Sequence, residues 1–153
     1  MFSLPLNTLL NKLAVVAGVL FISAFLLFGL NWGISNSAAT RADSRELAEA
    51  LVGWSPSDPQ THYAAAVFAA RDQNDEARKA SLAGFETAVA LAPRNYLIWT
   101  EYGRALERAG ETDRATLAFD RASELAPNYS SVAWARGNFL VRQGRVDAGF
   151  VEI

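Results

Sequence analysis

The pattern of apolar and polar residues divides the chain near residue 40. Leu13 to Leu30 is a run of 18 uncharged residues in which Ser23 is the one plainly polar side chain. After Arg41, apolar residues recur every three or four positions among charged ones, which is the spacing of one face of a helix. The sequence therefore predicts an all-α protein, with one long apolar helix followed by a series of short amphipathic helices.

The apolar run is long enough to cross a bilayer. At 1.5 Å per residue it spans roughly 27 Å, against roughly 30 Å for the hydrocarbon core. Twelve of its residues are Leu, Ile, Val or Phe, each of which favours insertion by about 0.3–0.6 kcal/mol at a helix centre. Trp32 follows where an interfacial aromatic residue belongs. We expect a short tail at 1–12 and a transmembrane helix at 13–34 that acts as a signal anchor and contacts lipid through residues 13–30.

A cleaved secretory signal is the alternative, with Lys12 as the basic region and Ser37-Ala38-Ala39 as the cleavage site. Signal peptides have an apolar region of about 7–15 residues, and here the small residues lie nine positions beyond Leu30. These lengths favour the uncleaved anchor. Lys12 on one side and Arg41 and Arg45 on the other nearly balance, so the basic residues decide little about orientation. We expect a single-pass protein with the repeats extracytoplasmic, which means periplasmic in a bacterium.

The rest of the chain repeats itself. Pro59, Pro93 and Pro127 are equally spaced along it. The same spacing relates four further pairs, which are Phe85 and Phe119, Ala88 and Ala122, Gly103 and Gly137, and Gly110 and Gly144. A fixed period of this length predicts stacked helix pairs. Gly110 and Gly144 suit the left-handed residue that ends the first helix of a pair, and Asp58 and Pro59 suit the N-cap and first residue of a helix.

Tyr96 to Tyr129 is the most regular unit. It contains Trp99, Tyr102-Gly103, Leu106, Ala115, Phe119, Ala122 and Pro127, in the order found in the tetratricopeptide repeat, which this unit resembles. The neighbouring units depart from the pattern, because Ala65 stands at the first aromatic position and Trp134 comes one place late. The resemblance covers rather more than half of the chain and implies an α-helical solenoid at 59–153, with two complete repeats and part of a third. Its repeat-defining residues are Pro59, Phe85, Pro93, Trp99, Gly103, Ala115, Phe119, Pro127 and Gly137.

Residues 35–58 are expected to form a linker and a capping helix. Asn31 to Thr40 is rich in Asn, Ser, Gly and Ala, which predicts a flexible exit from the membrane. A helix is predicted from about Ala42 to Val52, ended by the turn 55–58. Leu47, Leu51 and Trp54 fall at the offsets of Ser81, Phe85 and Ala88, so this helix is expected to cover the apolar end of the stack.

The resemblance also implies a binding groove, because the first helix of each pair lines the concave face in this family. The implied groove residues are Tyr63, Ala66, Ala70, Gln73, Leu97, Thr100, Arg104, Glu107, Arg108, Ser131, Trp134, Asn138, Val141 and Arg142. Tyr63, Gln73, Arg104, Arg108, Trp134, Asn138 and Arg142 are the expected partner contacts, because Arg pairs with carboxylates and exposed aromatics anchor interfaces. The alternative interpretation has equal weight: Trp134 is then a core residue, and the arginines form a face that contacts only solvent. Ala66 and Ala70 replace the first pair of the clamp that binds chaperone tails in some members, so that ligand is not expected.

Composition argues against catalysis. The chain has no Cys, one His, and neither a Gly-rich phosphate loop nor a metal-ligand pair at helical spacing. We expect no enzyme activity, cofactor or metal, and His62 is interpreted as a surface or capping residue. After residue 40 the 13 basic and 16 acidic residues leave a charge of −3, which favours no nucleic-acid partner.

The expected function is a membrane-tethered scaffold or assembly factor for a membrane-associated protein partner. A structural accessory subunit of a larger membrane complex, held by the apolar helix, is the alternative, and a cell-envelope polysaccharide or secretion accessory is a third. Only Val146 to Ile153 remain for the last helix, so further repeats are expected beyond residue 153. Without them, the apolar end formed by Phe139, Phe150 and Ile153 would be a docking surface.

Overall fold

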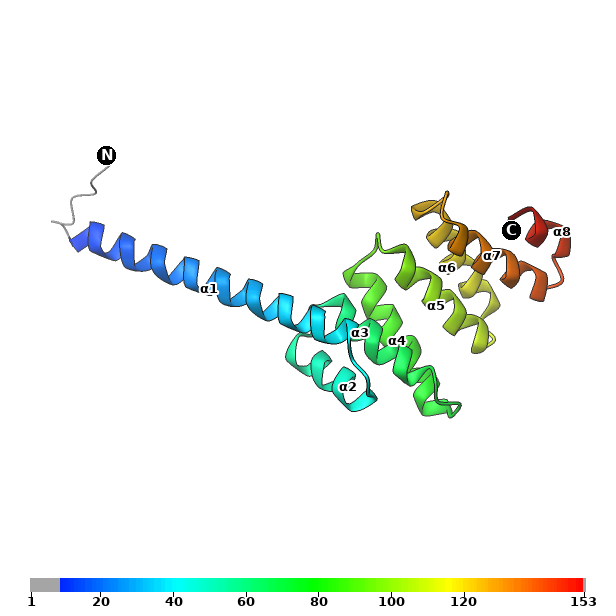
Figure 1. Ribbon diagram of the computed structural model, residues 1–153, viewed down its shortest axis with the longest axis horizontal. Helices are drawn as coiled ribbons and strands as arrows, with labels where there is room; N and C mark the ends of the chain where they lie inside the picture. Colours follow the sequence, from blue (N-terminus) through cyan, green and yellow to red (C-terminus); the bar gives the residue numbers. More distant parts are fainter. Residues whose placement is uncertain (1–8, 153) are drawn as a thin grey trace.

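The computed structural model describes residues 9–152, which form a rod and a stack of shorter helices (Figure 1). The helices are α1 (Leu9–Thr40), α2 (Arg45–Trp54), α3 (Pro59–Ala69), α4 (Asp75–Leu91), α5 (Tyr96–Arg108), α6 (Thr112–Leu125), α7 (Ser130–Arg142) and α8 (Val146–Glu152). The all-α prediction is confirmed. Most of the predicted tail, and Ile153, lie outside the described residues.

The second and third units repeat as predicted. α5 and α7 begin one sequence period apart, and so do α6 and α8. Each turn inside these pairs contains a glycine with positive φ, 77° at Gly110 and 79° at Gly144. A left-handed residue at this position lets the next amide reach back to the helix end, and Glu111 N–H donates to Leu106 O at 2.9 Å. The prediction that these glycines stop the first helix is confirmed.

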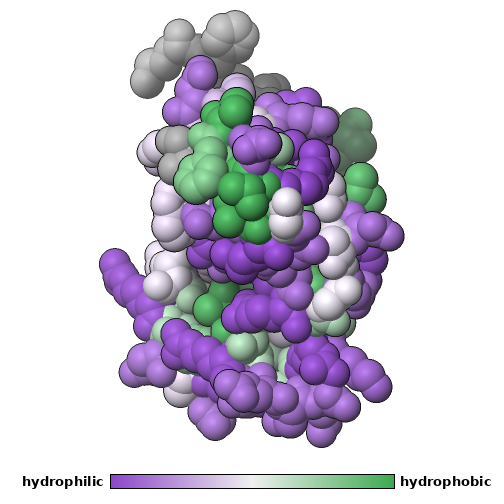
Figure 2. Space-filling model, turned by 90° about the vertical axis from the view of Figure 1, so that its right-hand side faces the viewer, coloured by the Kyte–Doolittle hydropathy of each residue, from purple (hydrophilic) through white to green (hydrophobic). Residues whose placement is uncertain are grey.

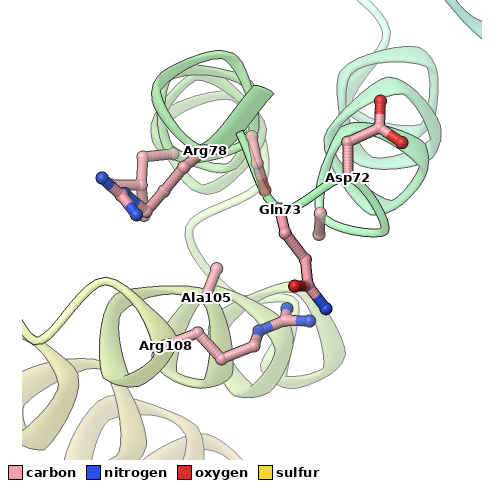
Figure 3. Close-up of a pocket in the computed structure, with 8 residues that line it drawn as sticks. Asp72, Gln73, Arg78, Ala105 and Arg108 are labelled. Carbon is pink, nitrogen blue, oxygen red and sulfur yellow. The ribbon is translucent and has the colours of Figure 1, made fainter. Parts of the chain in front are cut away.

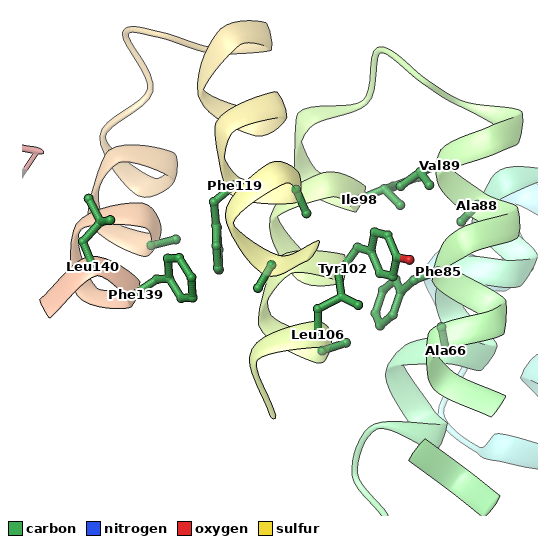
Figure 4. Close-up of a cluster of buried hydrophobic side chains, with 14 residues drawn as sticks. Ala66, Phe85, Ala88, Val89, Ile98, Tyr102, Leu106, Phe119, Phe139 and Leu140 are labelled. Carbon is green, nitrogen blue, oxygen red and sulfur yellow. The ribbon is translucent and has the colours of Figure 1, made fainter. Parts of the chain in front are cut away.

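Small residues allow the paired helices to approach closely. A Cβ on Gly103 would lie 3.1 Å from three ring atoms of Phe119, and one on Gly149 would lie 2.7 Å from Gly137 O. Ala115 is fully buried between α5 and α6. The buried rings of Phe85, Phe119 and Phe139 then follow one another along the stack (Figure 4). Phe85 and Phe119 fill the core as predicted.

In the first unit, the residues that are structurally equivalent to those of the second unit do not lie one sequence period away. Trp99 Nε1 donates to Pro93 O at 3.0 Å, and His62 Nε2 lies 2.9 Å from Pro56 O. Each proline precedes its aromatic partner by the same six positions, so Pro56, not Pro59, is the structural counterpart of Pro93. Pro59 is instead the first residue of α3, with Asp58 as its N-cap, as also predicted. α4 has 17 residues, against 14 in α6. These three additional residues place α3 three positions earlier in the chain than the sequence period predicts.

The predicted flexible linker is wrong. α1 continues without a break to Thr40, and Ser35 and Ala39 are buried. They lie one helical turn apart, so both face the same side, where Ala39 joins a small core with Ala48 and Leu51. Small residues favour close helix packing here rather than flexibility, because α2 runs back beside them. The following helix begins at Arg45 with Ser44 as N-cap, three residues later than predicted.

α2 covers the end of the stack with only part of the predicted face. Leu51 is buried, as its counterpart Phe85 is, but Leu47 and Trp54 are exposed. The reason is that α2 packs through Ala48 and Leu51, which are three residues apart on one face. Leu47 and Trp54 lie to the side of that face.

The opposite end of the stack carries exposed apolar side chains on α8. Figure 2 views this side of the molecule, where a hydrophobic patch lies among hydrophilic side chains. Phe150 and Val151 are exposed, whereas Phe139, expected at the exposed end, is buried against Phe119. Phe139 is therefore a core residue and not part of a docking surface.

Within residues 9–152, α1 is the one helix long and apolar enough to cross a membrane. Its 32 residues correspond to roughly 48 Å, and its most apolar stretch is not buried against any other part of the chain that the structure describes. A membrane span and a signal sequence both have these properties. The part of α1 that follows Leu30 packs on α2 and α3.

Candidate functional site

An open depression of about 500 Å³ lies where α5 and α7 face the same side of the stack. It is lined by Glu101, Arg104, Glu107, Arg108 and Arg142. Four of these five residues were predicted for the groove. Glu101 was missed, although its position three residues before Arg104 on a helix favours an ion pair.

Two of the three arginines in the depression are neutralised by carboxylates. Arg142 donates two parallel hydrogen bonds to Glu107, from Nε at 2.6 Å and NH2 at 2.8 Å. This pair joins α7 to α5, raises the pKa of Arg142, and leaves the Glu107 side chain 16% exposed. Arg104 NH1 lies 3.1 Å from Glu101 Oε1 on its own helix. Neither arginine is therefore a free cation for a partner.

Arg108 is different. Its Nε donates to Arg104 O at 3.2 Å, and among the described residues it is the arginine of this depression that forms no ion pair. The terminal nitrogens of its guanidinium keep their donors for another acceptor. Arg108 is thus the group of the depression most suited to an incoming carboxylate.

Arg108 also borders a second, smaller pocket of about 170 Å³. The lining residues are Ala70, Asp72, Gln73, Arg78, Ser81, Leu82, Ala105 and Arg108. In Figure 3, the side chains of Gln73 and Arg108 point toward one another. Ser81 is 2% exposed, and within the described part of the chain its Oγ has no hydrogen-bond partner.

Two charged residues of this pocket are already paired elsewhere. Asp72 accepts from Arg45 NH1 at 2.7 Å, and Arg78 donates to Asp75 at 2.5 Å. The sequence did not indicate Asp72, Arg78 or Leu82, because the pocket depends on where the α3–α4 turn lies, and the shift of the first unit moves that turn.

Three further predicted contacts, Tyr63, Trp134 and Asn138, lie outside the depression. Tyr63 is half-buried, and its ring meets Phe85 edge-on with centroids 6.0 Å apart. Burial, and then the charge of Glu101, raise the pKa of Tyr63. Trp134 is exposed, and Asn138 Nδ2 donates to its carbonyl oxygen at 2.7 Å. Neither Trp134 nor Asn138 lines the depression, and the interpretation of Trp134 as a core residue is wrong.

Two residues implied for the groove are buried instead. Ala66 packs between α3 and α4, where a Cβ on Gly84 would lie 2.9 Å from its own Cβ. The shifted register gives Ala66 the place that Gly103 has in the next unit. Thr100 is also buried and donates its hydroxyl to Tyr96 O at 2.8 Å, so it has no donor left for a partner.

The sequence matches no protein-family model and none of the curated proteins. The structure, in contrast, matches solved tetratricopeptide-repeat proteins. This chain is all-α, and its paired helices follow a long apolar helix. The class of protein defined by the paired helices is therefore TPR-like in fold.

Two of the matching structures illustrate this. TTC0263, a thermophilic TPR protein of Thermus thermophilus, has a TM-score of 0.64 and 18% identity, covering 80% of this chain and 64% of that one. A crystal structure of MamA has a TM-score of 0.61 and 18% identity, covering 71% of this chain. The chain spans 61% of the length of that MamA structure. At these identities the likeness concerns the fold.

Proposed function

We propose that this protein is a membrane-tethered, non-enzymatic scaffold or assembly factor that holds a protein partner in the depression around Arg108. The observation that carries the proposal is the continuity of α1. The exposed apolar run passes without a break into the part that packs on α3, so a lipid-embedded helix would hold the binding face at a fixed distance from the bilayer. The repeats would lie on the extracytoplasmic side.

Packing around the candidate cleavage site supports an uncleaved helix. Ser37-Ala38-Ala39 lies inside α1, and Ala39 is buried in the small core with Leu51 and Ala64. Cleavage there would remove Ser35 and Ala39 and expose the apolar faces of α2 and α3 that they cover. A chain that began at Thr40 would lack this packing and be less stable, which supports the proposal that the segment is retained.

Membrane retention tests the tether. Alkaline carbonate extraction is expected to leave the full-length protein in the membrane pellet. The matched control is Leu20→Arg combined with Leu26→Arg, because each Arg costs about 2.5–3.5 kcal/mol near the helix centre, and this variant should enter the supernatant. A soluble wild-type product beginning near Thr40 would show that the segment is a cleaved signal and would overturn the tether.

Arg108 is the residue on which partner binding should depend most. Hydrogen bonds to charged groups contribute about 1.5–3 kcal/mol, so Arg108→Ala is expected to weaken partner affinity about ten- to hundredfold. Co-purification in mild detergent, quantified against wild type, measures the loss, and circular dichroism checks that helicity is unchanged. Arg104→Ala is the control, because Arg104 is already paired with Glu101 and its loss should change recovery little.

The outcome of the same purification separates this proposal from its alternative. A partner recovered substoichiometrically, and lost in Arg108→Ala, agrees with a scaffold. A stoichiometric complex that survives Arg108→Ala would favour an accessory subunit held through α1, on which Phe21, Phe25 and Phe28 are exposed. If both Arg108→Ala and Arg104→Ala recover as much partner as the wild type does, the binding site lies outside the depression.

A further inference from the structure

Trp54, the last residue of α2, lies at about the same position along the axis of α1 as Trp32. After the turn at 41–44, α2 runs back beside the end of α1 (Figure 1). The nine steps from Arg45 to Trp54 cover roughly 13 Å along the helix axis. Nearly the same distance, measured back from Thr40 along α1, reaches Asn31 and Trp32. Trp54 therefore lies at about the height of Trp32, although the two belong to different helices.

Hydrogen bonds fix the position of the α2–α3 turn along the axis of α1. Ser35 Oγ lies 3.2 Å from Asp58 Oδ2 and 3.1 Å from Trp32 O, so its one hydroxyl hydrogen is shared between the two acceptors, and both Ser35 and Asp58 are buried. Thr61 Oγ1 lies 2.8 Å from Asp58 O and 3.1 Å from Ser55 O, so its one hydroxyl hydrogen links the α2–α3 turn to α3 through either carbonyl oxygen. The turn at 55–58 is therefore attached to α1 about one helical turn beyond Trp32.

The exposed part of the α2–α3 turn has no charged side chain. Val52 to Ser57 contains no ionisable side chain, and the Asp58 carboxylate accepts from Gln60 N–H and Ser35. The charged residues of α2 lie in its first half, where Arg45 pairs with Glu49. Trp54 is 57% exposed, so a large apolar ring with an N–H donor projects from an uncharged turn.

The level of the turn corresponds to the lipid headgroups. If the span ends at Leu30, Trp32 lies roughly 3 Å and Ser35 roughly 7.5 Å beyond it. The headgroup layer on each side of the hydrocarbon core is about 5–8 Å thick. Tryptophan is enriched in this layer because its ring prefers the apolar side and its N–H the polar side.

We propose that Trp54 and the uncharged α2–α3 turn form a lipid-contacting surface, which acts with Trp32 as a second interfacial anchor. α1 alone would let the repeats rotate about the helix axis. A second contact at one side of that axis would hold the domain, and with it the depression around Arg108, in one orientation to the bilayer. This inference rests on the membrane span of the proposed function.

Quenching by brominated lipid tests the surface. The chain has four tryptophans, and variants that retain one each, with Phe at the other three, are reconstituted in phosphatidylcholine vesicles brominated near the headgroup end of the acyl chains. Trp54 should be quenched about twofold or more relative to Trp134, with emission shifted to shorter wavelength. Trp134 is a matched control, because it is 56% exposed but lies on α7.

A second set of variants avoids changing Trp99, which packs against the core. In the otherwise native chain, Trp54→Phe should reduce the lipid-dependent quenching as Trp32→Phe does, and Trp134→Phe should leave it unchanged. If Trp32 is quenched while Trp54 behaves as Trp134 does, the lipid-contacting surface is wrong and the span stands. If neither Trp32 nor Trp54 is quenched, the span itself fails.

Discussion

Replacement of Phe119 by Ala is expected to lower the free energy of unfolding by about 3–5 kcal/mol. Phe119 is buried, its ring lies 4.8 Å from that of Phe139 between centroids, and Gly103 leaves just enough space for it. The ring thus contacts both its own unit and the next. Truncation would remove this contact and leave a cavity, because helices fixed by their neighbours collapse only partly into the space.

Urea denaturation of the detergent-solubilised protein, followed by circular dichroism, measures the loss. Leu117→Ala is the matched control, since Leu117 belongs to the same helix but is exposed, and its replacement should change stability by less than about 0.5 kcal/mol. Equal effects of the two substitutions would mean that Phe119 is not part of the core that joins the units.

The fold was most predictable where each signal is local. In residues 96–144, the glycines with positive φ act within one turn of their own position, so a fixed period in the sequence predicts the helix boundaries directly. The first unit was harder. Pro56 and Pro59 both lie close to a repeat distance from Pro93, and the period alone selects the wrong one. The caps Asp58 and Asn95 distinguish them, because each precedes its helix in the same way.

The segment after the membrane helix illustrates a different limit. Ser, Ala and Gly residues suit both a flexible linker and a closely packed helix, and local composition does not separate the two. Whether the segment forms a linker or a packed helix depends on whether another helix offers a surface against which Ser35 and Ala39 can pack. α2 and α3 do so, and this is a tertiary effect that overrides local preference.

For the candidate site, the resemblance to the tetratricopeptide repeat implied that Arg104, Arg108 and Arg142 lie on one side of the stack, and the structure brings them together in one depression. What the resemblance did not predict is their pairing. Arg142 and Glu107 are far apart in the sequence, and only the stacking of α7 against α5 makes them partners. The distinct status of Arg108 follows from that pairing and therefore required the structure.

Asp58→Ala is expected to lower the free energy of unfolding by about 2–4 kcal/mol, more than loss of a helix cap alone. Asp58 Oδ1 caps α3 by accepting from Gln60 N–H at 2.9 Å, while Oδ2 accepts from Ser35 of α1. A cap contributes about 1 kcal/mol, and a hydrogen bond to a charged group about 1.5–3 kcal/mol. The carboxylate is buried between α1 and α3, so its removal should also loosen the end of α1.

Asn74→Ala separates these two contributions, because Asn74 caps α4 by accepting from Ala77 N–H at 2.7 Å and lies beyond the opposite end of α3 from Asp58. Urea denaturation should show a loss of about 1 kcal/mol for Asn74→Ala. Limited proteolysis should cut only Asp58→Ala faster within residues 35–39, since Ser35 and Ala39 of that segment are buried by their packing on α2 and α3. If both variants lose the same stability and resist the protease equally, the carboxylate acts as a cap alone. The attachment of the membrane helix to the repeats would then rest on the apolar contacts of Ala39 and Leu51, and the orientation of the depression would depend on them.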